Sequence, residues 1–234
     1  MHKKVTKTIL DVNPPINPSI VLFGLSLGRN EFLPKFFPIM YAPLSNTATL
    51  KIAINKKILL INCESESEAK LVNKLAKNLR KKVPIGFRLN PNVDAKTHKN
   101  ISTGKAENKF GLSIKNFKVF LKTVKSFKNV KLDALSVHIG SQILNDAPFR
   151  KTLNVMSKLI KELKLNLKYV DLGGGFGINY TDKEKPINLS KYSKLVHNFS
   201  KKLNCKIIFE PGRSIIGNTA VSYTHLTLPT SDLV

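Results

Sequence analysis

The chain contains only two cysteines and no long uncharged apolar run. Cys63 and Cys205 are too few for a disulfide framework, and their spacing is not that of metal ligands. We therefore expect buried thiols and no metal site, with a redox role for the thiols as the alternative. No stretch of about 18 apolar residues is present, and the start of the chain leads into no signal-type apolar core. Neither membrane insertion nor export is indicated, and the cytoplasm is the expected location.

Arginine is also scarce, although the chain is strongly basic. The net charge is +24, yet only five of the 39 basic residues are arginines, and the lysines are dispersed through the predicted helices. A charge of this size normally suggests a nucleic-acid partner. Base readout and bidentate phosphate binding favour arginine, however, and no platform of interleaved aromatic and basic residues is present. We expect a solvated lysine-rich surface, with nonspecific, salt-sensitive binding to polyanions as the alternative.

Apolar runs alternate with amphipathic helical patterns through most of the 234 residues. The run at 58–62 is typical of a buried strand, and Ser65 or Ser67 can cap the helix that follows. Further strands are predicted at 84–89, 134–139, 169–172 and 206–209, with helices between them, one of which Ser113 can cap. Parallel strands buried on both faces explain why these runs are almost uniformly apolar. The pattern predicts an α/β protein of the wound or barrel type.

The two ends of the chain break this pattern. Residues 1–48 are rich in proline and phenylalanine and show no helical or strand period, so we expect an irregular or corrupted segment there. Residues 222–234 continue no preceding unit and resemble a translated sequencing adapter, which suggests a non-native tail. The predicted barrel domain therefore spans 49–221.

Three motifs follow successive predicted strands: His138-Ile139-Gly140-Ser141-Gln142, Asp171-Leu172-Gly173-Gly174-Gly175-Phe176-Gly177 and Glu210-Pro211-Gly212-Arg213. In a parallel barrel the strand ends share one mouth, so the three motifs are expected to surround one ligand. The glycines leave backbone N–H groups open to an anion such as phosphate, although a tight turn would use the same residues. They are not a dinucleotide fingerprint, because the G-x-G-x-x-G spacing and the later acidic residue are absent.

Each polar residue of these motifs has a chemical and a structural interpretation. Glu210 beside a pyridine nitrogen would favour the protonated, electron-withdrawing ring, or it could pair locally with Arg213. His138 could lie on a cofactor ring while Ser141 binds its phosphate, or it could be a satisfied structural histidine. The occurrence of all three motifs at strand ends favours a pyridoxal 5'-phosphate cradle.

The stretch from Ile58 to about Ala220 resembles diaminopimelate decarboxylase, a fold-type III pyridoxal phosphate enzyme. The resemblance rests on the three motifs and on Arg88-Leu89-Asn90-Pro91-Asn92-Val93-Asp94-Ala95-Lys96-Thr97-His98, Ile101-Ser102-Thr103-Gly104 and Glu107-Asn108-Lys109-Phe110-Gly111. It implies a pyridoxal phosphate-binding (β/α)8 TIM barrel of the alanine racemase-like type. It also implies decarboxylation of meso-2,6-diaminopimelate to L-lysine and CO2, by a homodimer. Ornithine and arginine decarboxylases share the Gly-rich and Glu-Pro-Gly-Arg motifs, but Gln142 after Gly-Ser and the Asp-Ala-Lys-Thr-His segment favour the diaminopimelate branch.

The resemblance also implies roles at the matching positions. His138 would stack on the cofactor ring and Glu210 would face the pyridine nitrogen, so these two are the predicted catalytic residues. Arg213 would bind a substrate carboxylate, and Arg88 would support the cofactor from behind. The residues that would surround the cofactor are Arg88, His138, Ser141, Gly173, Gly174, Gly175, Glu210, Pro211, Gly212 and Arg213.

Two parts of the family pattern have no match. The family's cofactor lysine lies in a Tyr-Ala-Leu-Lys-Ala-Asn type motif, whereas the look-alike here, Tyr41-Ala42-Pro43-Leu44-Ser45-Asn46, has Leu44 in place of the amine. The family's C-terminal β-domain is also unmatched. We therefore expect an inactive fragment whose incomplete barrel leaves two sheet edges open. The alternatives are a noncatalytic pyridoxal phosphate-binding barrel protein, a related ornithine- or arginine-type decarboxylase, and a basic interaction protein.

Overall fold

The computed structural model describes residues 22–26, 37–41, 46–95, 110–181 and 183–217. The strands are β1 (Leu22–Ser26), β2 (Phe37–Tyr41), β3 (Leu60–Cys63), β4 (Val83–Asn90), β5 (Leu112–Ser113), β6 (Val130–Val137), β7 (Tyr169–Asp171) and β8 (Lys206–Phe209). The helices are α1 (Thr47–Asn55), α2 (Glu66–Asn78), α3 (Ile114–Ser126), α4 (Ala147–Glu162), α5 (Leu189–Leu203) and α6 (Arg213–Ile216). Within these ranges, no helix combines the length and the hydrophobicity needed to cross a bilayer.

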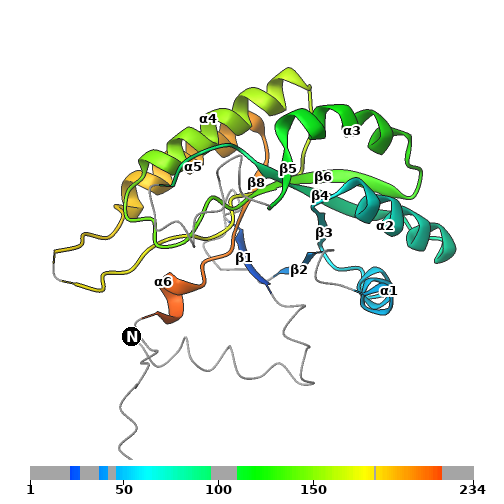
Figure 1. Cartoon of the computed structure of the whole chain (residues 1–234), viewed down its shortest axis with the longest axis horizontal. Coiled ribbons are helices and arrows are strands. Elements are labelled where there is room, and N and C mark those ends of the chain that lie inside the picture. Colours follow the sequence, from blue (N-terminus) through cyan, green and yellow to red (C-terminus); the bar gives the residue numbers. More distant parts are fainter. Residues whose placement is uncertain (1–21, 27–36, 42–45, 96–109, 182, 218–234) are drawn as a thin grey trace, which may run out of the picture.

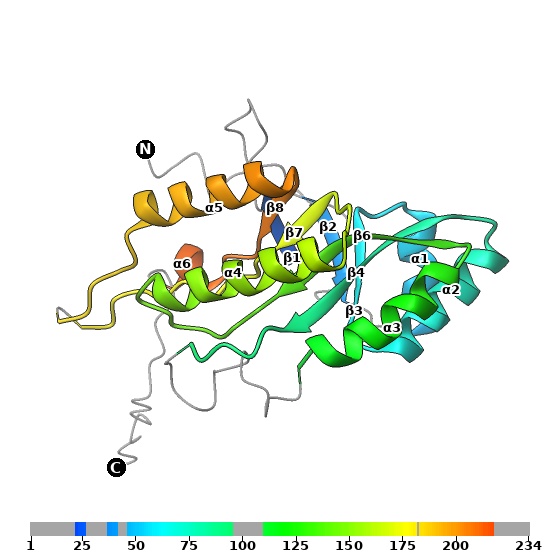
Figure 2. The ribbon, with the colours of Figure 1, turned by 90° about the horizontal axis from the view of Figure 1, so that it is seen from above.

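The described strands form one sheet in the order β3-β2-β1-β8-β7-β6-β4-β5. An additional pairing of β3 with β4 joins the two sides, so the sheet closes into a ring. Most neighbours in the ring run parallel, but β1 runs antiparallel to both β2 and β8. Figure 1 shows α1 to α5 on the outside of these strands, and Figure 2 shows α4 and α5 side by side. The predicted α/β barrel architecture is confirmed.

The N-terminal segment differs from its prediction. β1 and β2 lie within residues 1–48, for which the sequence predicts no regular element, and α1 crosses the boundary at 48. Ile39 is 1% exposed and pairs with Leu60 of β3, so this strand is part of the sheet. The prediction of two open edges is also wrong for the described strands, because β1 pairs with β2 on one side and with β8 on the other. The domain boundaries themselves stay predictions.

Local signals place the helix starts. The side chains of Ser65 and Ser113 accept hydrogen bonds from the amides of Glu68 and Asn116, which confirms the predicted cap at Ser113 and selects Ser65 over Ser67. Asn46 and Asn188 cap α1 and α5 in the same way. Each cap satisfies an amide that the first helical turn leaves without an intrahelical partner.

The core lies between the sheet and its helices. Phe87 of β4 packs against Phe117 and Phe120 of α3, with ring centroids 5.8 and 5.4 Å apart. A second aromatic cluster joins Phe149 of α4 to Phe176, at a centroid distance of 5.2 Å. Burial of each such ring stabilises the fold by roughly 1.5–3 kcal/mol. Because Phe176 follows the triple glycine, the second cluster anchors the glycine segment to the helical layer.

Both cysteines are free and buried, as the sequence predicts. Burial raises the pKa of the Cys63 thiol far above its usual range and that of Cys205 to about 11. The thiolate is the reactive form of cysteine, so both side chains are present as inert thiols at neutral pH.

Candidate functional site

Three loops meet at the carboxyl ends of β6, β7 and β8. The residues that pair in register across these strands are Ser136, Asp171 and Ile208. His138, Gly173 and Glu210 each lie two positions beyond one member of this row, so they emerge at the same level of the barrel. The structure therefore brings the three predicted motifs together.

The triple glycine passes closely between the other two loops. A Cβ atom on Gly173 would lie 2.8 Å from Nδ1 of His138, and one on Gly174 would lie 2.3 Å from the carbonyl oxygen of Glu210. A Cβ atom on Gly175 would lie 2.4 Å from the carbonyl oxygen of Gly140. Gly173 and Gly175 also have φ values of +64° and +98°, a backbone conformation that residues with a Cβ atom rarely adopt. Glycine is needed here for both space and backbone conformation.

Hydrogen bonds join the glycine segment to its neighbours. The Gly174 amide donates to His138 Nδ1 over 3.2 Å, and the Gly173 amide donates to Asp171 Oδ1 over 2.9 Å. The carbonyl oxygen of Gly173 accepts from the Glu210 amide over 2.9 Å. The amides of Gly173 and Gly174 therefore donate within the protein, and they shape the segment. Phosphate binding by Gly173, Gly174 and Gly175 stays a prediction.

The imidazole of His138 is held neutral. Burial and, as a smaller cause, the nearby positive charge of Arg88 together lower its pKa to about 4. Because Nδ1 accepts the hydrogen bond from Gly174, the proton of the neutral ring is assigned to Nε2. At neutral pH, His138 thus offers an uncharged aromatic face at the mouth of the barrel.

Arg88 on β4 is fixed by an acidic residue that the sequence analysis missed. Its guanidinium forms an ion pair with Glu64 at 2.8 Å, with side-chain exposures of 14% and 17%. The second carboxylate oxygen of Glu64 accepts from the Gly111 amide over 3.0 Å, and the guanidinium lies 5.3 Å from the ring centroid of Phe110. Glu64 directly follows β3, so its position at a strand end was the available signal.

Arg213 lies at the start of α6 and is directed toward two polar side chains. It donates to Gln142 Oε1 over 3.4 Å and to the Tyr180 hydroxyl over 3.2 Å. Gln142 also bonds both backbone groups of Ile178, which ties the β6–α4 loop to the segment after the glycines. Of the other predicted residues, Ser141 is half-buried beside Gly140, and Gly212 is exposed before α6. Tyr180 was not predicted as a site residue.

The match to known proteins agrees with this geometry. Residues 38–217 match the family described as "Pyridoxal-dependent decarboxylase, pyridoxal binding domain". The chain belongs to this family. It is 35% identical over 192 residues to diaminopimelate decarboxylase of Aquifex aeolicus, covering 80% of the chain and 46% of the relative. It is 39% identical over 183 residues to the Vibrio cholerae enzyme, covering 76% of the chain and 44% of the relative.

Solved structures give the same assignment. Diaminopimelate decarboxylase from Helicobacter pylori, complexed with L-lysine, superposes with a TM-score of 0.69 at 35% identity. This alignment covers 76% of the chain and 45% of the solved chain. The predicted membership of the diaminopimelate decarboxylase-like barrels is confirmed. The chain spans about half the length of the curated relatives it matches.

Some predicted segments of the pyridoxal binding domain lie outside the described residues. These are Lys96 to Lys109, which carry much of the family resemblance, and Ala42 to Ser45 of the lysine-motif look-alike. The look-alike begins at the end of β2, which pairs directly with β3, so residues 37–63 form a single β/α unit.

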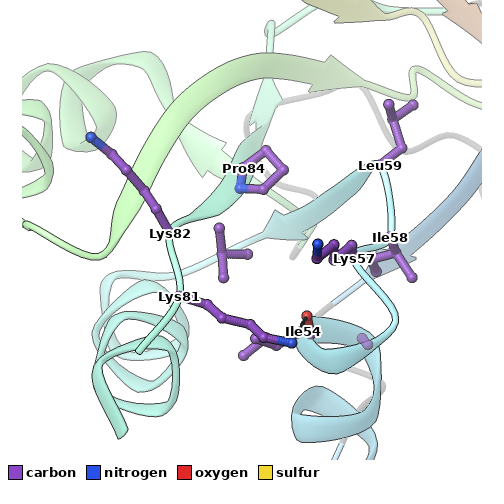
Figure 3. Close-up of a pocket in the computed structure, with 9 residues that line it drawn as sticks. Ile54, Lys57, Ile58, Leu59, Lys81, Lys82 and Pro84 are labelled. Atoms are coloured by element: carbon purple, nitrogen blue, oxygen red, sulfur yellow. Dashed lines mark hydrogen bonds between the residues drawn. The ribbon is translucent and has the colours of Figure 1, made fainter. Parts of the chain in front are cut away.

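A pocket of about 420 Å³ lies at the opposite end of the barrel. It is formed where α1 ends and where β3 and β4 begin, and Figure 3 shows Lys57, Lys81 and Lys82 around its apolar wall. Lys81 Nζ donates to the carbonyl oxygen and the side-chain oxygen of Asn55 over 3.2 and 2.9 Å. The amino-terminal face of a β/α barrel usually serves stability, so this pocket is separate from the candidate site.

Proposed function

We propose that the chain is the pyridoxal 5'-phosphate-binding part of a diaminopimelate decarboxylase. This enzyme is a carboxy-lyase that converts meso-2,6-diaminopimelate to L-lysine and CO2 in lysine biosynthesis. The observation that carries the proposal is the convergence of His138, the triple glycine and Glu210 at one level of a barrel of this family. The 35–39% identity to enzymes of this name supports the choice of substrate.

The residues present suit the cofactor. The neutral imidazole of His138 provides a flat face for an aromatic ring, and Glu210 provides a carboxyl group at the same level. The glycine segment leaves no room for side chains, so the three loops pack closely together at this end of the barrel. When bound, the pyridine ring would withdraw electrons from the carbon that loses its carboxylate.

Each residue then has a separate task. Glu210 would hold the proton on the pyridine nitrogen, and His138 would orient the ring by stacking. Ser141, Gly175, Pro211 and Gly212 would form the phosphate end of the site. Arg213, already directed to Gln142 and Tyr180, would bind a carboxylate of the substrate. Arg88, held by its ion pair with Glu64, would support the cofactor from behind.

For the whole protein, we propose a cytoplasmic homodimer that acts on a small-molecule amino acid, without nucleic-acid or membrane partners. An ornithine- or arginine-type decarboxylase and a noncatalytic pyridoxal phosphate-binding barrel are the alternatives. Release of CO2 by the full-length protein from meso-diaminopimelate, compared with ornithine and arginine, separates these three possibilities.

Cofactor binding by the chain itself is tested at Glu210. Titration of the purified chain with pyridoxal phosphate should produce a protein-specific absorbance change, which Glu210→Ala should abolish and Glu210→Gln should alter. Glu162→Gln is the matched control, because Glu162 lies on the exposed face of α4, paired with Lys118. An unchanged spectrum and affinity in both Glu210 variants would refute the proposed role of this carboxyl group.

A further inference from the structure

A buried carboxyl group lies directly beneath the triple glycine. Asp171 is the last residue of β7 and has 0% exposure. Its Oδ1 accepts from the Gly173 amide over 2.9 Å. Its Oδ2 lies 3.3 Å from the Ser136 hydroxyl of β6 and 3.4 Å from the Asn62 side-chain nitrogen of β3. The carboxyl group thus connects three strands inside the barrel and one amide at its mouth.

Packing alone does not explain an acidic residue at this place. The interior of a β/α barrel is usually filled by branched apolar side chains, which avoid the cost of removing a carboxyl group from water. Burial of such a group costs several kcal/mol unless donors surround it. Ser136 and Asn62, both 0% exposed, supply two of these donors, one from the neighbouring strand β6 and one from β3, which does not pair with β7 in the described sheet. The arrangement fixes the orientation of the Asp171 side chain.

The amide that donates to Asp171 belongs to Gly173, which starts the segment that contacts Glu210 and His138. Gly173 adopts a φ of +64°, and its carbonyl oxygen accepts from the Glu210 amide. The next amide, that of Gly174, donates to His138 Nδ1. The orientation of the peptide between Gly173 and Gly174 therefore affects the positions of both predicted catalytic residues, His138 and Glu210.

We propose that Asp171 is a positioning residue for the pyridoxal phosphate site, acting through the Gly173–Gly174 peptide on His138 and Glu210. This inference rests on the proposed function for its role in cofactor binding. Asp171 itself contacts neither ring nor phosphate in this scheme. Its effect is to hold the glycine segment, and through it the imidazole, in the arrangement that a ring requires.

The main experiment compares Asp171→Asn with the unchanged chain. An asparagine keeps the size of the side chain but places an NH2 group against the donors of Ser136 and Asn62, or against the Gly173 amide. We expect the dissociation constant for pyridoxal phosphate to rise at least tenfold. In the cofactor-free protein, the amide resonances of Gly173 and Gly174 and the Nδ1 signal of His138 should shift in 15N spectra.

The control for general destabilisation is Thr152→Val. Thr152 is buried in α4, away from the loops, and its hydroxyl donates to the Pro148 carbonyl oxygen over 2.9 Å. This variant should lower the unfolding temperature while leaving the His138 signal and cofactor affinity within twofold of the unchanged chain. A second variant, Ser136→Ala with Asn62→Ala, removes two side-chain donors to Oδ2 and should raise the dissociation constant several-fold.

The outcomes separate the two proposals. If Asp171→Asn, or the double variant where Asp171→Asn does not fold, leaves both the His138 Nδ1 signal and the cofactor affinity unchanged, the positioning role is wrong. If the unchanged chain does not bind pyridoxal phosphate, the proposed function of the chain fails. The 15N shifts of the cofactor-free protein still decide whether Asp171 positions the glycine segment.

Discussion

The amide of Gly174 donates a hydrogen bond to Nδ1 of His138 over 3.2 Å, so a loop after β7 fixes an imidazole at the end of β6. This contact requires an unprotonated Nδ1. It links the charge state of one histidine to the shape of the glycine segment and makes the site sensitive to acid.

The pH dependence of stability follows from this contact. The pKa of His138 is lowered from 6.5 to about 4. Between pH 6.5 and pH 4, the unfolded chain therefore binds a proton at His138 that the folded chain does not bind. The stabilising contribution is therefore complete above pH 6.5 and is lost as the pH falls toward 4, by on the order of 2–3 kcal/mol. Denaturant unfolding from pH 4 to 8 should show this loss, and His138→Gln should reduce it.

The matched control for this measurement is His197→Gln, which removes an exposed histidine of α5. It should retain the pH dependence of the unchanged chain. If His138→Gln leaves the same slope as His197→Gln, the imidazole does not carry the effect.

Alanine substitution of the glycines should distinguish positions where an added Cβ atom has no space from a position where it has. An alanine at 174 or 175 would bring its Cβ atom to within 2.3 or 2.4 Å of a backbone carbonyl oxygen. The backbone must move, and we expect a loss of roughly 2 kcal/mol or more in the free energy of unfolding. At Gly212 no atom lies within 4 Å of the added Cβ. Chemical denaturation should therefore place Gly212→Ala within about 0.5 kcal/mol of the unchanged chain; equal losses at all three positions would contradict the packing described.

The ion pair between Arg88 and Glu64 should contribute more to stability than an exposed pair. Glu64→Gln leaves the poorly exposed guanidinium of Arg88 without its charged partner, at an expected cost of about 2 kcal/mol. Glu162→Gln removes the same charge from the exposed pair with Lys118, for which less than about 1 kcal/mol is expected. Unfolding at two salt concentrations checks the difference, because screening weakens the exposed pair more. A larger loss for Glu162→Gln would overturn the prediction.

Lys81 should stabilise the end of α1. Its ammonium group donates to the Asn55 carbonyl and side-chain oxygens, where the helix leaves acceptors without partners. Lys81→Met should cost about 1 kcal/mol in unfolding free energy. Lys82→Met changes the adjacent, exposed lysine and should cost little. Equal effects of the two substitutions would remove the capping role.

Local patterns were enough for much of the fold. The cap at Ser113, the buried run after α1 and the amphipathic helices that follow are decided within a few residues, because capping and hydrophobic period act over one or two turns. The three motifs were recognisable for a related reason: parallel strands place their carboxyl ends at one mouth. Their convergence could therefore be predicted from strand order alone.

The first strands escaped prediction because their evidence is not local. The short segment that contains Ile39 lies among prolines and aromatic residues, and only its pairing with Leu60 of β3 reveals a strand. Ring closure through β1 likewise depends on pairing with β8, far away in the sequence. Backbone pairing across such separations has no signature in either segment by itself.

By itself, the sequence determined the alternation of strands and helices, their caps and the residues available at the barrel mouth. The tertiary structure alone decided which residues from different strands touch. The Arg88–Glu64 pair, the Asp171–Ser136 contact and the Gly174–His138 contact join different strands or loops. The physical reason is that hydrogen bonds and ion pairs depend on distances of about 3 Å, which only the packing of the closed barrel sets.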